Sequence, residues 1–123
     1  MARTALTIQS PPGKYPATPI AANGADFTWE AGDAGDNNSF KSTGREIVLV
    51  RNDNAGAQTV TIHSMIDERN REGDITAYSI GAGEYAVFGP FPVAGWRQPD
   101  GTVHIDPSHA DLKFAVLQLP ALS

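Results

Sequence analysis

The sequence predicts an all-β protein: an antiparallel β-sandwich of the jelly-roll type, with an extended proline-rich arm at its N-terminus. Apolar and polar residues alternate from residue 46 onward, and turn-forming residues recur at roughly ten-residue spacing. No stretch has the periodicity of a helix longer than two turns. The chain has 123 residues, which is enough for one domain with a hydrophobic core and too few for two.

The first third of the chain is expected to be mostly arm. Residues 4–9 (TALTIQ) read as a strand with Leu6 and Ile8 on one face. Residues 10–26 contain four prolines and two glycines and show no period, which favours an extended, polyproline-like segment. The resulting division is 1–26, the N-terminal strand and arm, and 27–123, the sandwich domain.

The body of the sandwich is expected to begin with a short strand at 26–30 (DFTWE). A polar turn follows at 31–39, where Gly, Asp and Asn are concentrated. Residues 39–46 then lead into the core.

The most regular pattern lies between residues 46 and 65. The segment EIVLVR, 46–51, is apolar and β-branched, as a buried strand requires. The segment 59–65 alternates, with Val60 and Ile62 on one side. Because the turn-rich stretch NDNAGAQ separates the two, we predict that they pair as a β-hairpin.

Four more strands are expected in the second half of the chain. They are 75–80, 84–91, 102–106 and 112–119. Pro90 and Pro92 lack the backbone donor that a β-ladder needs, so they mark the end of the second of these strands. The sequence QPDG at 98–101 suits a type I turn. Residues 106–111 are a polar connector with at most one helical turn.

Composition excludes several classes of function. The chain has no cysteine, so disulfides, thiolate catalysis and cysteine-based metal sites are excluded. Its nine Lys and Arg residues are scattered and the net charge is −5, which argues against direct nucleic-acid binding. No apolar run reaches membrane-spanning length and the first residues lack the apolar core of a signal peptide, so we expect synthesis in a cytoplasm and no membrane partner.

Histidines are the main candidates for chemistry. His63 lies on the polar side of its strand, where a solvated role is expected. His104 and Asp106 share one face of a strand, and such a pair binds metal or orients a base only with a further partner. No third ligand stands at a recognisable spacing, so we expect surface pairing instead.

Two other polar clusters resemble sites only superficially. Ser108, His109 and Asp111 lie too close in sequence to converge as a hydrolase triad, and no nucleophile elbow is present. The loop 33–38 is rich in oxygen ligands but lacks the calcium-loop pattern. We therefore predict a protein that is not an enzyme, with no catalytic residues, no metal and no cofactor.

Residues for contact with a partner are sought among loop aromatics and in the mixed-charge loop at 67–72, since aromatic residues and Arg are enriched at interface hot spots. The candidates are Tyr15, Trp29, Phe40, Arg69, Arg71 and Trp96. Three further aromatic residues, Phe88, Phe91 and Phe114, are expected in the core.

Three runs of the sequence carry a resemblance to a known class of protein. RNDNAGAQTVTIHS, then GDITAYSIGAGEYAVFGPFPVAGWRQPDGTVHID, then LKFAVLQLP, resemble capsid decoration (cement) proteins of tailed bacteriophages. The resemblance covers about residues 46–120 and rests on the sequences of the expected strands and turns. It implies a β-sandwich, often trimeric, that lies on the exterior of the virion capsid and is assembled there in the host cytoplasm. It also implies the major capsid protein as partner and an arm that reaches a neighbouring subunit.

Two other functions remain open at this point. One is a different structural part of a virion, such as a head–tail connector or tail component. The other is a carbohydrate-binding or cupin-like domain that uses Trp29 or Trp96 as a sugar platform, with His104 and Asp106 nearby.

Overall fold

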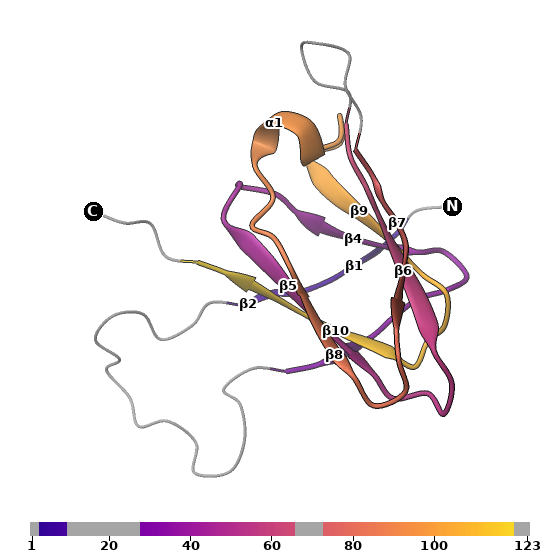
Figure 1. The fold of residues 1–123 in the computed structure, drawn as a ribbon. Helices are drawn as coiled ribbons and strands as arrows, with labels where there is room; N and C mark the ends of the chain where they lie inside the picture. The colour runs from indigo at the N-terminus through magenta and orange to yellow at the C-terminus, as the bar shows by residue number, and fades with distance from the viewer. Residues whose placement is uncertain (1–2, 10–27, 66–72, 120–123) are drawn as a thin grey trace, which may run out of the picture.

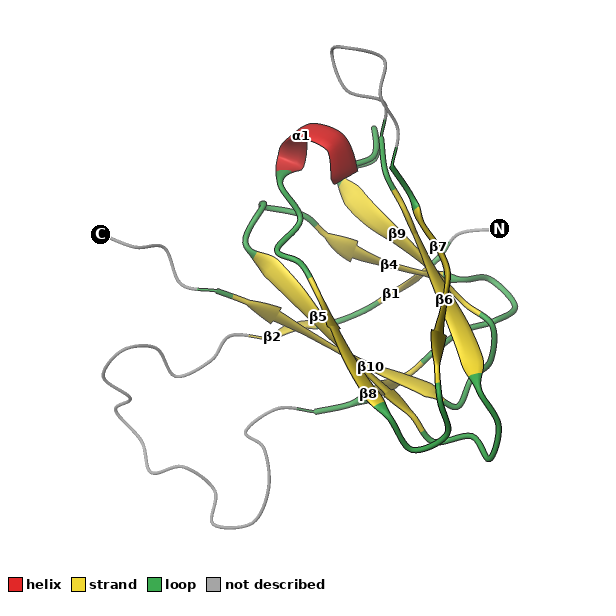
Figure 2. Ribbon diagram, viewed as in Figure 1, coloured by secondary structure: helices red, strands yellow, loops and turns green. Residues whose placement is uncertain are grey.

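Two β-sheets packed face to face make up the structure, a computed structural model that describes residues 3–9, 28–65 and 73–119 (Figure 1). The all-β prediction is confirmed at this level. Figure 2 shows the strands in two layers, with the single helical turn α1 at one end of them. In chain order the elements are β1 (Thr4–Ala5), β2 (Ile8–Gln9), β3 (Glu30–Ala31), β4 (Asn38–Lys41), β5 (Glu46–Asn52), β6 (Gln58–His63), β7 (Ile75–Ile80), β8 (Tyr85–Phe88), α1 (Val93–Trp96), β9 (Thr102–Pro107) and β10 (Leu112–Gln118).

The two sheets are mixed. The first sheet has the order β1-β4-β9-β6-β7, and the second has the order β2-β10-β5-β8, with β3 also paired to β10. The longer strands pair antiparallel, but β1 runs parallel to β4 and β2 runs parallel to β10. The prediction of a purely antiparallel sandwich was therefore wrong at these two edges, where one N-terminal segment adds a short parallel strand to each sheet.

The antiparallel pairs are nested along the chain. β6 pairs with β7, β5 with β8, β4 with β9, and β3 with β10. After β3, each strand except β7 lies in the other sheet from the strand before it, so most connections cross between the sheets.

The predicted hairpin between 46–51 and 59–65 is wrong for this reason. The two segments are strands at the expected positions, but β5 lies in the second sheet and β6 in the first. Val48 and Val50 enter the core from one sheet, and Val60 and Ile62 enter it from the other. Alternation predicts which side of a strand is buried, but it does not reveal which strand lies beside it.

The core fills the space between the sheets. Phe88, Phe91 and Phe114 are buried there, as predicted. The ring of Phe91 contacts Trp96 edge-on at a centroid distance of 5.0 Å, so α1 closes one end of the core. α1 is a single irregular turn, because Ala94 and Gly95 depart from helical dihedral angles.

The N-terminal residues belong to the sandwich body. Leu6, between β1 and β2, is 5% exposed and joins the core. The Gln9 side chain accepts a hydrogen bond from the Thr28 amide and donates one to the Thr28 carbonyl, both at 2.7 Å. The predicted extended segment, 10–26, lies outside the described residues, and the strands that flank it in the chain, β2 and β3, both pair with β10.

Glu46, at the start of β5, is a buried carboxylate with a full set of donors. It is 1% exposed and accepts hydrogen bonds from the Thr43 amide (2.8 Å), the Thr43 hydroxyl (2.6 Å) and Gln118 Nε2 (2.9 Å). Burial acts to raise the pKa of Glu46, but the donors on Thr43 and Gln118 outweigh it and lower the pKa below its ordinary value.

We expect Glu46→Gln to lower the free energy of unfolding by about 1–3 kcal/mol at pH 7, because it leaves a buried donor without its acceptor. A depressed folded-state pKa stabilises the fold above the ordinary Glu pKa of about 4.3, and that stabilisation is lost as pH falls through the folded-state value. Urea denaturation at several pH values should thus show variant and wild type converging in acid. The account would be contradicted if the difference in unfolding free energy between wild type and Glu46→Gln stayed constant with pH. It would also be contradicted if Glu84→Gln, at an exposed position, caused an equal loss.

Candidate functional site

The two outward-facing sheet surfaces differ in chemistry, and both are candidates for function. The outer surface of the first sheet carries ionisable side chains, and we call it the polar face: Arg3, His63, Asp74, Asp100, His104 and Asp106. The outer surface of the second sheet carries aromatic and aliphatic side chains, and we call it the aromatic face: Trp29, Leu49, Arg51, Tyr85 and Val87.

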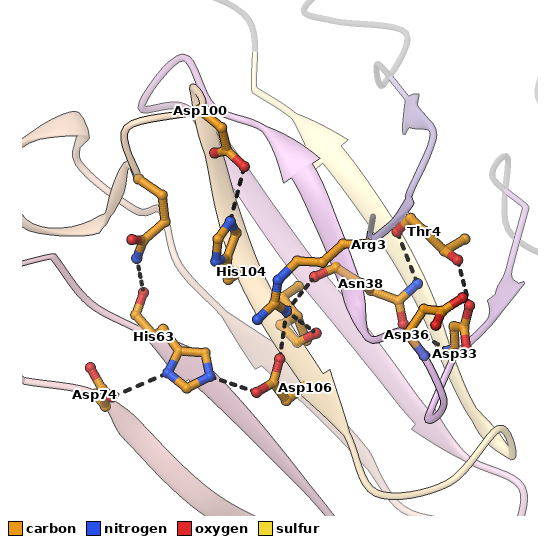
Figure 3. A network of polar contacts seen from close by, with 12 residues as sticks. Arg3, Thr4, Asp33, Asp36, Asn38, His63, Asp74, Asp100, His104 and Asp106 are labelled. Atoms are coloured by element: carbon orange, nitrogen blue, oxygen red, sulfur yellow. Dashed lines mark hydrogen bonds and ion pairs between the residues drawn. The ribbon is translucent and has the colours of Figure 1, made fainter. Parts of the chain in front are cut away.

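The polar face centres on His63 of β6 (Figure 3). In the β6–β9 register, Thr61 lies opposite Asp106, so His63 reaches Asp106 as a diagonal neighbour on the same side. His63 Nε2 lies 2.6 Å from Asp106 Oδ2, and Nδ1 lies 3.3 Å from Asp74 Oδ2, just before β7. Both ring nitrogens therefore face a carboxylate.

These contacts shift the charge states of the three groups. The hydrogen bond to Asp106, with the charges of both carboxylates, raises the pKa of His63 against the effect of burial. Burial acts to raise the pKa of Asp106, but hydrogen bonds from His63 and Arg3 bring it below its ordinary value. The hydroxyl and amide of Ser64 lower the pKa of Asp74. The arrangement favours a charged imidazolium between two ionised carboxylates.

Arg3 ties the segment before β1 to the same network. Its Nη1 donates to Asp106 Oδ1 at 2.5 Å, to the Asn38 carbonyl at 3.1 Å and to the Ile105 carbonyl at 3.4 Å. The next residue, Thr4, donates its hydroxyl to Asp33, which lowers the pKa of that carboxyl. The N-terminal segment is thus held to the first sheet by charge as well as by strand pairing.

His104 belongs to a separate pair. Its Nε2 lies 3.1 Å from Asp100 Oδ2. The Thr102 hydroxyl, together with His104, lowers the pKa of Asp100 to about 2. His104 and Asp106 share a face, as the sequence indicates, but they do not pair with each other.

A shallow hollow of about 390 Å³ opens beside these groups. Its lining residues are Arg3, His63, Ser64, Met65, Asp74, Gln98 and His104. Within residues 3–9, 28–65 and 73–119, no three His, Asp or Glu side chains are grouped so that they could hold a metal ion. Because both ring nitrogens of His63 face carboxylates, His63 has no free nitrogen for a substrate or a metal.

His63 differs from its predicted role. Its side chain is 34% exposed and is held between two partners, so it is not a freely solvated strand residue. No local pattern signals this, because Asp74 lies 11 residues along the chain and Asp106 lies 43 residues along it.

The polar segment at 108–111 is a turn, as predicted, but the turn predicted at 31–39 is shorter, because Ala31 ends β3 and Asn38 begins β4. Asp33 Oδ1 accepts hydrogen bonds from the amides of Gly35 and Asp36. Ser108 donates to Gln58, and His109 Nδ1 accepts from the Asp111 amide. Asp33 and His109 thus stabilise their own turns, whereas Ser108 is bonded to β6, and Ser108, His109 and Asp111 do not assemble a triad.

The aromatic face is built from neighbouring strands in register. Tyr85 and Val87 of β8 are 67% and 61% exposed. They lie directly opposite Arg51 and Leu49 of β5, so the four side chains occupy one surface.

Trp29 extends this surface from the other side. Continuing the β3–β10 register by one residue places Trp29 opposite Ala115 of β10. Its ring lies 6.1 Å from the Tyr85 ring, and the Arg51 guanidinium lies 4.9 Å from its centre. Arg51 is held in turn by two hydrogen bonds to Asp53, at 2.8 and 2.9 Å. The indole therefore reaches across β10 and is oriented by its neighbours.

The predicted contact residues have different positions. Trp29 lies on the aromatic face, whereas Phe40 is 1% exposed and belongs to the core, where it offers no surface to a partner. Trp96 is partly buried against Phe91. The other three, Tyr15, Arg69 and Arg71, lie outside the described residues.

Sequence reasoning missed Tyr85, Val87 and Arg51. The alternation that could have revealed them is present in 84–88, where Tyr85 and Val87 point to one side of the strand and Ala86 and Phe88 point to the other. Because both sides of this strand are apolar or aromatic, alternation does not show here which side faces solvent.

Comparisons with protein-family models, with curated proteins and with solved structures found no match. Within the described part of the chain, no helix has the length and apolar character needed to cross a membrane.

Proposed function

We propose that this protein is a virion structural protein that binds the outer surface of a tailed-phage capsid and stabilises the shell by bridging subunits of the major capsid protein. The observation that carries the proposal is the aromatic face, where exposed Tyr85 and Val87 adjoin Trp29 and Arg51. The resemblance of residues 46–120 to capsid decoration proteins supplies the identity of the partner.

The chemistry of the aromatic face suits protein contact. Tyr, Trp and Arg are enriched at hot spots, where a few large side chains contribute most of the binding energy. Because Arg51 holds Trp29 and Asp53 holds Arg51, these side chains lose little conformational freedom when a partner binds. An exposed, ordered cluster of this kind is typical of an interaction surface.

We also propose that the sandwich is a jelly roll. A jelly roll forms when one long antiparallel hairpin is wrapped into two sheets. The nested pairs β3·β10, β4·β9, β5·β8 and β6·β7 support this assignment, as does their distribution into β3-β10-β5-β8 and β4-β9-β6-β7. Jelly rolls recur among viral capsid domains.

The same resemblance supports a homotrimer on the capsid exterior, and we include this in the proposal. Sugar binding is less favoured by the geometry. A sugar platform needs an open ring face, but Arg51 occupies one face of the Trp29 ring and Trp96 packs edge-on against Phe91.

The test uses shells of the encoding phage that lack this protein. Purified protein added to expanded shells should co-sediment in a saturable manner, at many copies per shell, and should raise the temperature at which the shells break. Binding only in the few copies that surround a portal would instead favour a head–tail connector. No binding to shells at all would refute the proposal.

A further inference from the structure

We propose that His63 is a proton-dependent clamp, which in its doubly protonated form fastens Asp74, the residue before β7, to the end of β6 and releases it on losing a proton. This inference concerns regulation within the fold and does not depend on the proposed function. It rests on the positions of Asp74, Asp106 and Arg3 around the imidazole.

The geometry fits only one protonation state of the ring. A neutral imidazole donates from one nitrogen and accepts at the other, whereas an imidazolium donates from both. If His63 donates from Nε2 to Asp106 at 2.6 Å, a neutral ring turns a lone pair on Nδ1 toward Asp74 Oδ2 at 3.3 Å. Two acceptors would then face each other, and the other neutral tautomer moves the same conflict to Asp106. The contacts with Asp74 and Asp106 are therefore both attractive only when the ring carries both protons.

The charges around the clamp balance in the protonated state. Asp74, His63, Asp106 and Arg3 form a row of alternating charge, and the sum of the four is zero when His63 is protonated. Loss of that proton leaves the row with a net negative charge. Of the other described groups on this surface, His104 lies opposite His63 across the β6–β9 pair, and Asp100 is bound to His104.

The clamp acts on the ends of the connection between β6 and β7. The second oxygen of Asp74 accepts hydrogen bonds from the Ser64 amide at 2.7 Å and the Ser64 hydroxyl at 2.8 Å. The Gly73 amide donates to the same hydroxyl at 2.8 Å. Asp74 thus joins the end of β6 to the start of β7, and repulsion from a neutral His63 weakens that junction.

Arg3 limits the effect to this junction. Its guanidinium keeps Asp106 and the carbonyls of Asn38 and Ile105 when His63 is neutral. The N-terminal strand pairing, including the Leu6 amide bonded to the Ser39 carbonyl at 2.8 Å, does not pass through His63. Deprotonation should therefore loosen the junction and leave β1 in place.

The direction of the pH dependence follows from the raised pKa of His63. A histidine whose pKa is higher in the closed state stabilises that state fully below the ordinary value of about 6.5, and the stabilisation is lost as pH rises through the closed-state value. The junction should be firm at mildly acidic pH and looser at alkaline pH.

Amide hydrogen exchange measured by NMR on the full chain tests this inference. Protection of the Ser64 and Gly73 amides, corrected for the intrinsic effect of pH, should fall as pH rises from 5.5 to 8.5, by about tenfold for each unit by which the closed-state pKa exceeds 6.5. The Leu6 amide should show no such response. His63→Gln should abolish the response, and His104→Gln, which alters the other His–Asp pair on this face, should retain it.

Protection of Ser64 and Gly73 that does not change with pH in the wild type would overturn the inference, as would a response that survives His63→Gln. A second readout covers the case in which that variant fails to fold. The ring signals of His63 in the wild-type protein should titrate with a midpoint above 6.5, and Asp74→Asn should lower that midpoint. A wild-type midpoint at or below 6.5 contradicts the clamp.

Discussion

Replacing Phe114 with alanine is expected to lower the free energy of unfolding by about 3–5 kcal/mol. Phe114 is 0% exposed and lies on β10, which pairs with β5 along its length and also carries β2 and β3. Truncation removes buried apolar surface and leaves a cavity that the surrounding strands fill only in part. Urea denaturation followed by far-UV circular dichroism measures the change.

Tyr85→Ala is the matched control, because it removes a ring of similar size from a side chain that is 67% exposed. We expect it to cost less than about 1 kcal/mol, since little surface there is removed from water on folding. A loss below about 1 kcal/mol for Phe114→Ala, or equal losses for the two variants, would mean that the core is not where the sandwich places it.

Replacing both Tyr85 and Val87 with alanine is expected to weaken shell binding by at least about 30-fold, the equivalent of losing one hot-spot contact of about 2 kcal/mol. Both side chains are exposed in the isolated chain and flank the Trp29–Arg51 contact, so their truncation removes interface area without opening the core. Co-sedimentation of purified variants with expanded shells gives the dissociation constants.

The control for this pair lies on the other sheet. Thr76 and Ser79 of β7 are also exposed, and their replacement with alanine should leave shell binding within about twofold, as expected for residues outside an interface. If the β7 variant lost binding while the β8 variant kept it, the aromatic face would not be the contact surface.

Strand positions could be predicted from the sequence because burial in a two-layer sheet imposes a period of two on each strand. The expected strands at 75–80 and 112–119 match β7 and β10 to within one residue. Sheet membership could not be predicted in the same way. β5 and β6 both alternate and are joined by a short turn, and nothing within either segment shows that the turn crosses between sheets.

The side chains of the candidate sites come from residues that lie still farther apart in the sequence. The clamp around His63 unites Arg3, Asp74 and Asp106, which come together only through the order of strands in the first sheet. Phe40 was predicted as a contact residue, but β4 turns it into the core. Residues 3–9 contain a recognisable strand pattern. That they add one short strand to each sheet depends on the positions of β4 and β10, which this pattern does not show.

The central claim is that this protein acts by adhesion through the aromatic face. A cryo-electron microscopy map of shells decorated with the purified protein tests it most directly, because the map shows which sheet faces the capsid. The account predicts that β8 and β5, with Tyr85 and Val87, lie against the major capsid protein and that the polar face with His63 points to solvent. A map with the first sheet against the shell, or with the aromatic face fully exposed to solvent, would contradict it.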